Sequence, residues 1–265
     1  MPSILIFDSG IGGLSVLSHI RQKLPSATIN YVADHAAYPY GDKQEQWLIK
    51  RIDHLFAKMV EDLKPDLAVI ACNTASTLIL PTLRARVTIP IVGVVPAIKT
   101  AAKLSKTKHI GLLATPGTVA RQYMDDLIRE FADDCKVDRL GTTDLVHLAE
   151  EKISGNPLCL DTLENATRDL LSKGMDTVVL GCTHFPLLLD ELTALYPTIH
   201  FVDSGEAIAR RTESLLKPSA SSNTNDDNRM RYYSTSAISA AQINQLKGFG
   251  FTQFNELNFG ISSSA

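Results

Sequence analysis

Short apolar runs alternate with longer amphipathic segments along most of this 265-residue chain. The short runs are rich in β-branched residues and almost continuously apolar, which is typical of parallel strands buried on both faces. We predict strands at residues 4–7, 29–32, 67–71, 91–95, 110–113, 178–180 and 199–202. Apolar positions at helical spacing predict helices at residues 13–24, 43–63, 76–86, 116–131 and 158–172. This alternation favours βαβ units, and therefore an α/β fold with mostly parallel sheets.

The pattern contains an internal repeat. Residues 66–72 and 176–182 both begin with Asp, have Val at the fourth position and end in Cys. A second pair of strand ends matches at a similar spacing, with Ser9 in one and Thr115 in the other. Such a repeat predicts two pseudosymmetric α/β lobes with an active-site cleft between them. We expect the first lobe at residues 1–95 and 208–265, and the second at residues 96–207.

The C-terminal region follows a different pattern. Residues 218–228 contain no large apolar side chain, so we expect a mobile surface loop there. The segment that follows contains Phe249, Phe251 and Phe254, which need burial. We therefore expect this tail to pack against the first lobe.

Composition and charge narrow the possible functions. The net charge of −3 provides no basic surface field for nucleic acid or an anionic membrane. No apolar stretch reaches the ~20 residues of a membrane helix, and the first apolar run is too short for a signal peptide. We therefore expect a soluble, cytoplasmic protein. The four cysteines form no C-x-x-C pair, so we expect free thiols and no metal site.

Cys72 and Cys182 are the strongest candidates for chemistry. A single free cysteine usually only fills space in a core, but two at equivalent strand ends, each with a threonine within two residues, favour a function. Each also lies at the expected start of a helix, where the helix dipole lowers the pKa of a thiol. We therefore predict two facing acid/base groups with lowered pKa values. Cys135 and Cys159 lie outside such contexts and are assigned no role.

Two turns allow both a structural and a functional interpretation. Asp8 and Ser9 begin a glycine-rich connection, which is either a simple strand-to-helix turn or a site whose backbone N–H groups receive a carboxylate. The Pro-Tyr-Gly turn at residues 39–41 is typical of loops, but Tyr40 could also form the wall of a pocket and Gly41 could let the backbone approach a ligand.

Other polar residues complete the candidate set. His184 is either a structural histidine or a partner that exchanges a proton with Cys182. Glu150 is most simply part of a solvated helix face. No lysine lies in a context typical of a Schiff base, so we expect no pyridoxal phosphate or other cofactor. Neutral hydrogen-bonding groups at strand ends are Asn73, Thr74, Thr115, Thr118 and Thr183.

Together these residues resemble the glutamate racemases, cofactor-independent enzymes of the aspartate/glutamate racemase superfamily. The resemblance covers most of the first 217 residues. Its most specific motifs are Ala-Cys-Asn-Thr-Ala-Ser at residues 71–76 and Leu-Gly-Cys-Thr-His-Phe-Pro at residues 180–186. Supporting motifs lie at residues 7–14, 39–43 and 114–119.

The resemblance implies interconversion of L- and D-glutamate by two acid/base groups, which supplies D-glutamate for peptidoglycan synthesis. It implies that Cys72, assisted by Asp8, acts on D-glutamate, and that Cys182, assisted by His184, acts on L-glutamate. Asp34 and Glu150 resemble acidic positions near the site, and homodimers are common among such enzymes. The substrate-binding residues that it implies are Asp8, Ser9, Tyr40, Gly41, Asn73, Thr74, Thr115, Thr118, Thr183 and His184.

Three other interpretations remain open. The chain could be an aspartate racemase or another two-cysteine isomerase of the superfamily, which turnover of both amino acids distinguishes. It could be an amino-acid-binding module without catalysis, although binding alone requires no thiol; exchange of the α-hydrogen with solvent deuterium distinguishes this case. A role as an interaction protein acting on a topoisomerase has no supporting docking segment in the sequence.

Overall fold

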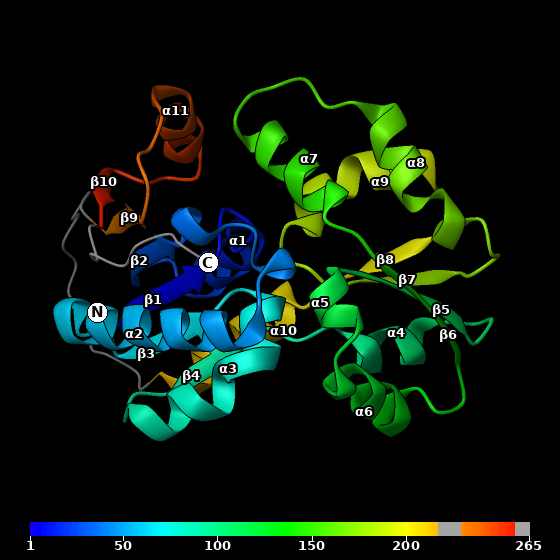
Figure 1. Cartoon of the computed structure of the whole chain (residues 1–265), viewed down its shortest axis with the longest axis horizontal. Coiled ribbons are helices and arrows are strands. Elements are labelled where there is room, and N and C mark those ends of the chain that lie inside the picture. Colours follow the sequence, from blue (N-terminus) through cyan, green and yellow to red (C-terminus); the bar gives the residue numbers. More distant parts are fainter. Residues whose placement is uncertain (217–228, 258–265) are drawn as a thin grey trace.

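The computed structural model describes residues 1–216 and 229–257. Within them the chain forms two β-sheets in which every pairing of neighbouring strands is parallel. Figure 1 shows the two sheets side by side, each with its own helices. The predicted α/β fold with two mostly parallel sheets is therefore confirmed. The loop expected at residues 218–228 lies outside the described residues.

The first sheet has six strands in the order β10-β9-β2-β1-β3-β4. In β1, Ile4 and Ile6 belong to one core while Leu5 and Phe7 belong to the other, and all four side chains are fully buried. A strand covered on both faces needs apolar side chains at every position, which explains its continuous apolar run. The strands are β1 (Ser3–Asp8), β2 (Thr28–Ala33), β3 (Leu67–Ile70), β4 (Ile91–Gly93), β9 (Met230–Ser234) and β10 (Gln253–Glu256).

The second sheet has four strands in the order β6-β5-β7-β8. This order repeats β2-β1-β3-β4 of the first sheet, strand for strand, so the sequence repeat corresponds to a repeated topology. The strand β6 was not predicted, because its residues Lys-Val-Asp-Arg-Leu-Gly mix charged and apolar side chains at a sheet edge. The strands are β5 (His109–Ala114), β6 (Lys136–Gly141), β7 (Thr177–Leu180) and β8 (His200–Val202).

Helices cover both faces of each sheet (Figure 1). On the first sheet, one face carries α2 (Glu45–Leu63) and α3 (Asn73–Arg86), and the other carries α1 (Leu14–Lys23) and α10 (Gly205–Leu215). On the second sheet, one face carries α4 (Ile98–Leu104) and α6 (Gln122–Phe131). Its other face carries α7 (Asp144–Ile153), α8 (Leu160–Leu171) and α9 (Leu189–Leu195).

The helix predicted at residues 116–131 is interrupted. A short helix, α5 (Pro116–Val119), ends before α6 begins at Gln122. Arg121 between them has an extended backbone, with φ −79° and ψ 140°, and therefore starts a new helix instead of continuing the old one. The side chain of Arg121 is used elsewhere, as described below.

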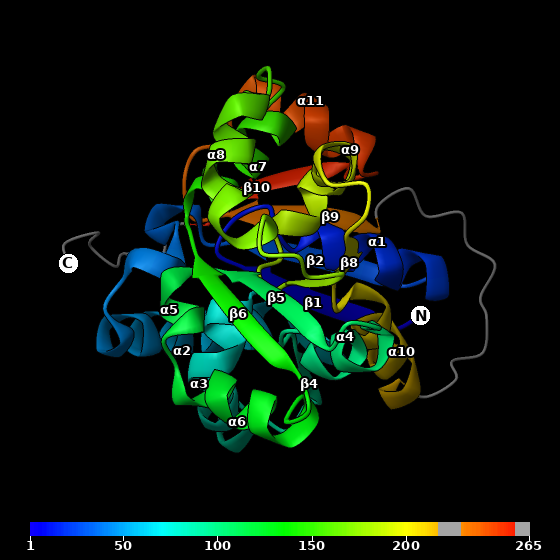
Figure 2. The ribbon, with the colours of Figure 1, turned by 90° about the vertical axis from the view of Figure 1, so that its right-hand side faces the viewer.

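The C-terminal tail extends the first sheet. β9 pairs with β2, and β10 pairs with β9. Figure 2 shows both strands together with α11 (Ala240–Gly248) at one end of the molecule. Phe251 is buried, with its ring centroid 5.9 Å from that of Tyr31 and 5.4 Å from that of Tyr232. Each aromatic pair of this geometry contributes about 0.5–1.5 kcal/mol of stability beyond that of burial. This cluster therefore stabilises the packing of the tail against the sheet.

Among the residues that the structure describes, no helix has both the length and the apolar character needed to cross a membrane.

Candidate active site

Both candidate cysteines follow the corresponding strand of their sheet. Cys72 comes two residues after β3 and immediately precedes α3, and Cys182 comes two residues after β7. Both are free thiols, and their side chains are buried. The carboxyl ends of parallel strands are where open α/β folds place their reactive groups.

Asp8, the last residue of β1, is linked to Cys72 through Ser9. The thiol of Cys72 lies 3.9 Å from the Ser9 hydroxyl, which donates to Oδ1 of Asp8 at 3.1 Å. The backbone N–H of Gly10 donates to the same oxygen at 3.0 Å. Asp8 has no exposed surface, and burial raises its pKa although the positive charge of His184 and these hydrogen bonds oppose the shift.

The prediction of a lowered pKa is wrong for Cys72. Burial, followed by the negative charge of Asp8, raises the pKa of this thiol. A hydrogen bond from the backbone N–H of Ala75, in the first turn of α3, acts in the predicted direction but is the smaller effect. Desolvation in the closed site therefore outweighs the helix terminus.

Cys182 has a different partner, His184. Nδ1 of this ring lies 3.8 Å from the sulfur of Cys182, and Nε2 lies 2.9 Å from Oε1 of Glu150. Burial opposes protonation of the ring, but hydrogen bonds with Cys182 and Glu150 outweigh it and raise the pKa of His184 well above its ordinary value. The ring of His184 thus bridges the sulfur of Cys182 and the carboxylate of Glu150, where it can exchange a proton with the sulfur.

Glu150 does not lie on a solvated helix face, as its pattern suggested. Its side chain is 15% exposed and reaches from α7 to the glycine-rich turn, where Oε1 accepts a hydrogen bond from the backbone N–H of Ile11 at 3.0 Å. Burial raises the pKa of Glu150, but the hydrogen bond with His184 and the nearby ring of His35 outweigh it and hold this pKa far below its ordinary value. Glu150 is therefore an ionised residue of the site.

A hydrogen bond between Asp8 and Thr183 connects the residues around Cys72 with those around Cys182. The hydroxyl of Thr183 donates to Oδ2 of Asp8 at 3.0 Å, while Ser9 donates to the other oxygen. One hydrogen-bonded chain thus runs from the neighbour of Cys72 to the residue beside Cys182. The charge of Cys182 is also among the causes that raise the pKa of Cys72, so the two thiols share one site.

The glycine-rich turn carries the backbone of the first half directly against these side chains. A Cβ at Gly12 would lie 2.4 Å from Nδ1 of His184 and 2.7 Å from Oγ1 of Thr183. A Cβ at Gly10 would lie 2.3 Å from Oε1 of Glu150. Only glycine permits this approach, which explains the turn better than a simple connection does.

Three threonine hydroxyls from both halves form a second polar cluster. The Oγ1 atoms of Thr74 and Thr115 lie 3.0 Å apart, those of Thr115 and Thr118 3.0 Å, and those of Thr74 and Thr118 3.3 Å. A Cβ at Gly41 would lie 3.0 Å from that of Thr115, so the Pro-Tyr-Gly turn also reaches this cluster. The cluster adjoins the N-terminus of α3, where free N–H groups favour an anion.

Arg121 holds this cluster together across the two halves. Its Nη1 donates to the backbone oxygen of Thr74 at 3.1 Å and to the hydroxyl of Thr77 at 2.8 Å. Its Nε pairs with Glu45 of α2 at 3.0 Å. The guanidinium thereby ties the segment between α5 and α6 to the first turn of α3.

Asp34 fixes the position of the Tyr40 side chain. Its carboxylate accepts a hydrogen bond from the Tyr40 hydroxyl at 2.7 Å and two from Arg51, both at 2.6 Å. Thr235 in the C-terminal tail adds another at 2.7 Å. Asp34 has no exposed surface, and its partners occupy both of its oxygens, so it positions Tyr40.

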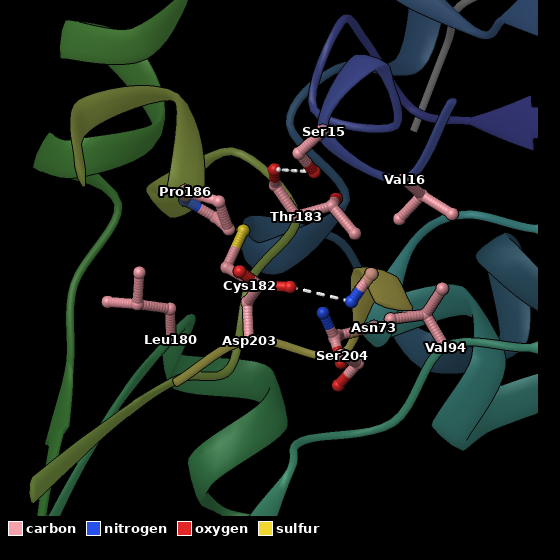
Figure 3. Close-up of a pocket in the computed structure, with 11 residues that line it drawn as sticks. Ser15, Val16, Asn73, Val94, Leu180, Cys182, Thr183, Pro186, Asp203 and Ser204 are labelled. Atoms are coloured by element: carbon pink, nitrogen blue, oxygen red, sulfur yellow. Dashed lines mark hydrogen bonds between the residues drawn. The ribbon is translucent and has the colours of Figure 1, made fainter. Parts of the chain in front are cut away.

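Asn73 and Cys182 border a small pocket between the two halves (Figure 3). Ser15 of α1 closes one side by donating to the backbone oxygen of Thr183 at 2.8 Å. Oδ1 of Asn73 is buried and has no hydrogen-bond partner within the described residues. The pocket is lined by Ser15, Val16, Asn73, Val94, Leu180, Cys182, Thr183, Pro186, Asp203, Ser204 and Gly205.

Sequence reasoning missed four residues of this region. Arg51 lies in the amphipathic α2 and Arg121 in a segment predicted to be helical, where charged side chains are ordinary. His35 is a single histidine after a strand, and Thr235 follows a strand that lies far away in the sequence. Only the glycine spacing around Gly12 contained a signal, since close approach of another element is one reason for glycine.

No group of His, Cys, Asp and Glu side chains in the described parts of the chain has an arrangement suited to a metal ion.

The two sheets have the same strand order, and in each a thiol lies at the end of the equivalent strand. Comparison with known sequences identifies the class of protein that has this arrangement. A family model described as Asp/Glu/hydantoin racemase matches residues 15–212, and the chain belongs to this family. The protein is therefore an isomerase.

Within the family the chain is similar to glutamate racemases. The glutamate racemase of Shewanella loihica is 49% identical over 94% of this chain and 93% of its own length, and that of Vibrio cholerae is 52% identical over 81% of each. The crystal structure of Escherichia coli glutamate racemase in complex with L-glutamate and the activator UDP-MurNAc-ala has a TM-score of 0.89 at 44% identity. It covers 97% of this chain and 98% of its own. The predicted resemblance to the glutamate racemases is confirmed.

Proposed function

We propose that the protein interconverts L- and D-glutamate, with Cys72 and Cys182 as the two acid/base groups on opposite faces of Cα. The observation that carries the proposal is the pair of thiols at equivalent strand ends, each with its own acid/base partner. The high identity to glutamate racemases supports glutamate as the substrate. We place the lobes at residues 1–95 with 208–265 and at residues 96–207, in keeping with the two sheets.

In the direction from L- to D-glutamate, the Cys182 thiolate removes the α-proton and becomes a thiol. The electron pair remains on Cα as a carbanion, and the Cys72 thiol delivers its proton to the opposite face and becomes a thiolate. The reverse direction exchanges these roles. His184, held by Glu150, stabilises the thiolate of Cys182, and Asp8 acts on Cys72 through Ser9.

The raised pKa of Cys72 fits a group that rests as a thiol. A substrate α-ammonium beside this sulfur would supply a positive charge and lower its pKa, so that the thiolate forms only when substrate is bound. The buried and unpartnered Oδ1 of Asn73 is a suitable acceptor for such an ammonium group.

The carbanion needs stabilisation, and Arg51 and Arg121 do not supply it because their guanidinium groups are engaged elsewhere. Backbone N–H groups at the start of α3 and the threonine hydroxyls provide preorganised dipoles, which are effective in a site closed to water. The residues that we propose to hold the substrate are Ser9, Tyr40, Gly41, Asn73, Thr74, Thr115, Thr118 and Thr183.

The test is to replace each thiol alone, Cys72→Ser and Cys182→Ser, and to follow racemisation by circular dichroism. Both variants should lose racemisation almost completely with an unchanged unfolding temperature. In D₂O, Cys72→Ser should still exchange the α-hydrogen of L-glutamate, because Cys182 can remove and return a proton on its own face. Cys182→Ser should exchange only D-glutamate.

Three outcomes would refute the proposal. Near-normal racemisation by either variant would exclude the two-base mechanism. Turnover of aspartate with none of glutamate by the unmodified protein would exclude glutamate as the substrate, and the absence of exchange with both amino acids would leave only a binding function.

A further inference from the structure

The carboxylate of Glu150 has a second imidazole neighbour that the reaction described above does not use. His35 begins the short 3₁₀ helix that follows β2, directly after Asp34. Its Nε2 lies 3.6 Å from Oε2 of Glu150, whereas His184 binds Oε1. This Nε2 is buried and has no hydrogen-bond partner in the described residues, so Glu150 is the polar group that it faces. A buried polar atom left unpaired is costly and needs a reason.

We propose that His35 is a positioning residue for the Cys182 half of the reaction. Its Nε2–H faces Oε2 of Glu150, which keeps this carboxylate ionised and turns its other oxygen toward His184. The consequence passes through His184 to the thiolate of Cys182. The inference rests on the proposed two-base function and adds a residue that serves only one of the two thiols.

The contacts of Glu150 imply that loss of His35 affects Cys182 and not Cys72. The carboxylate is held by His184, by the backbone N–H of Ile11 and by His35, which come from three different segments. The partners of Cys72 are Ser9 and, through it, Asp8, and neither forms a hydrogen bond with Glu150 or His35. Loss of His35 should therefore weaken the Cys182 side and leave the Cys72 side unchanged.

The distance limits the size of the effect. At 3.6 Å the contact is longer than a regular N–H···O hydrogen bond, so its contribution is mainly electrostatic. We expect a loss of about three- to tenfold, which corresponds to about 0.6–1.4 kcal/mol. Such a loss is measurable if each half of the reaction is observed separately.

Overall racemisation cannot separate the halves. Enantiomers have equal free energies in water, so kcat/KM must be equal in the two directions for every variant. Exchange of the α-hydrogen in D₂O removes this constraint. Cys72→Ser with L-glutamate reports the Cys182 half, and Cys182→Ser with D-glutamate reports the Cys72 half.

Three substitutions are then compared in each background. His35→Phe keeps the ring shape and removes both nitrogens. His35→Gln places an amide N–H near the position of Nε2. The matched control is His147→Phe: Nδ1 of His147 lies 3.2 Å from the Tyr38 hydroxyl, and no hydrogen bond or ion pair among the described residues joins this ring to Glu150.

We expect His35→Phe to slow exchange of L-glutamate about three- to tenfold and to leave exchange of D-glutamate unchanged. His35→Gln should restore most of the loss, and His147→Phe should not reproduce it. Equal slowing in both backgrounds, no rescue by Gln, or the same loss with His147→Phe would overturn the role of His35. If neither parent thiol variant exchanges glutamate at all, the proposed function fails instead, so the two failures are distinguishable.

Discussion

The close approach of the glycine-rich turn to His184 predicts that Gly12→Ala disables the Cys182 side of the site. The new Cβ would lie 2.4 Å from Nδ1 and 2.7 Å from Cε1 of His184, where ordinary contacts begin at about 3.4 Å. The imidazole would have to move by about 1 Å, and a displacement of that size can cost about 10²-fold in rate. Its contacts are 3.8 Å to Cys182 and 2.9 Å to Glu150, so it cannot move away and keep both.

The assay is racemisation by circular dichroism at saturating and limiting glutamate, together with thermal unfolding. We expect kcat to fall about 100-fold, and the overpacking to cost about 1–3 kcal/mol of stability. Gly248→Ala is the matched control, because Gly248 ends α11 and a Cβ there would have no heavy atom within 4 Å. That variant should keep its activity.

One result would refute this reasoning: Gly12→Ala with kcat within about threefold of the unmodified protein and an unchanged unfolding temperature. The ring of His184 would then move to accommodate the new Cβ without loss of activity, and its position would not limit the rate of the reaction. A variant that unfolds early but racemises normally at low temperature would show that the contact matters only for stability.

Three further predictions concern charged groups. Burial raises the pKa of Asp8, so its ionised form disfavours folding above the ordinary pKa of 3.8. Asp8→Asn should therefore raise the unfolding temperature at pH 7, and this stabilisation should disappear below pH 3.8. The same variant should have a lower kcat. Arg51→Met leaves the buried Asp34 carboxylate without its cationic partner. The free energy of unfolding, measured in urea, should fall by about 3–5 kcal/mol, and Tyr40 should be displaced. The lowered pKa of Glu150 stabilises the fold above its ordinary pKa of 4.5, so Glu150→Gln should be clearly less stable at pH 7, with a gap that narrows as the pH falls below 4.5.

Much of the site was predictable because its residues follow strands. Each parallel sheet brings the carboxyl ends of its strands to one edge, β1 and β3 in the first sheet and β5 and β7 in the second. Asp8 was therefore expected near Cys72, and Thr115 near Cys182, without any knowledge of side-chain packing. Glycines and threonines next to these strand ends were found for the same reason.

The remainder depends on contacts between the two halves, which no local pattern contains. Glu150 has the spacing of an ordinary exposed helix residue, and only the approach of the glycine-rich turn makes it part of the site. The pKa of Cys72 was predicted in the wrong direction because the helix terminus is visible in the sequence, whereas the desolvation by burial in the folded site is not. The edge strand β6 was missed because charged and apolar residues are mixed along it, and the apolar run typical of a buried strand is absent.

The attachment of β9 beside β2 has a consequence for shortened versions of the chain. The family match ends at residue 212, so a chain cut after α10 would keep every residue that we propose to touch the substrate. It would nevertheless expose the backbone edge of β2, which invites aggregation by strand pairing between molecules. It would also remove Thr235 from the carboxylate that orients Tyr40. The minimal active unit is therefore expected to extend beyond the residues that the family model matches, and affinity tags or fusion partners should not replace the tail.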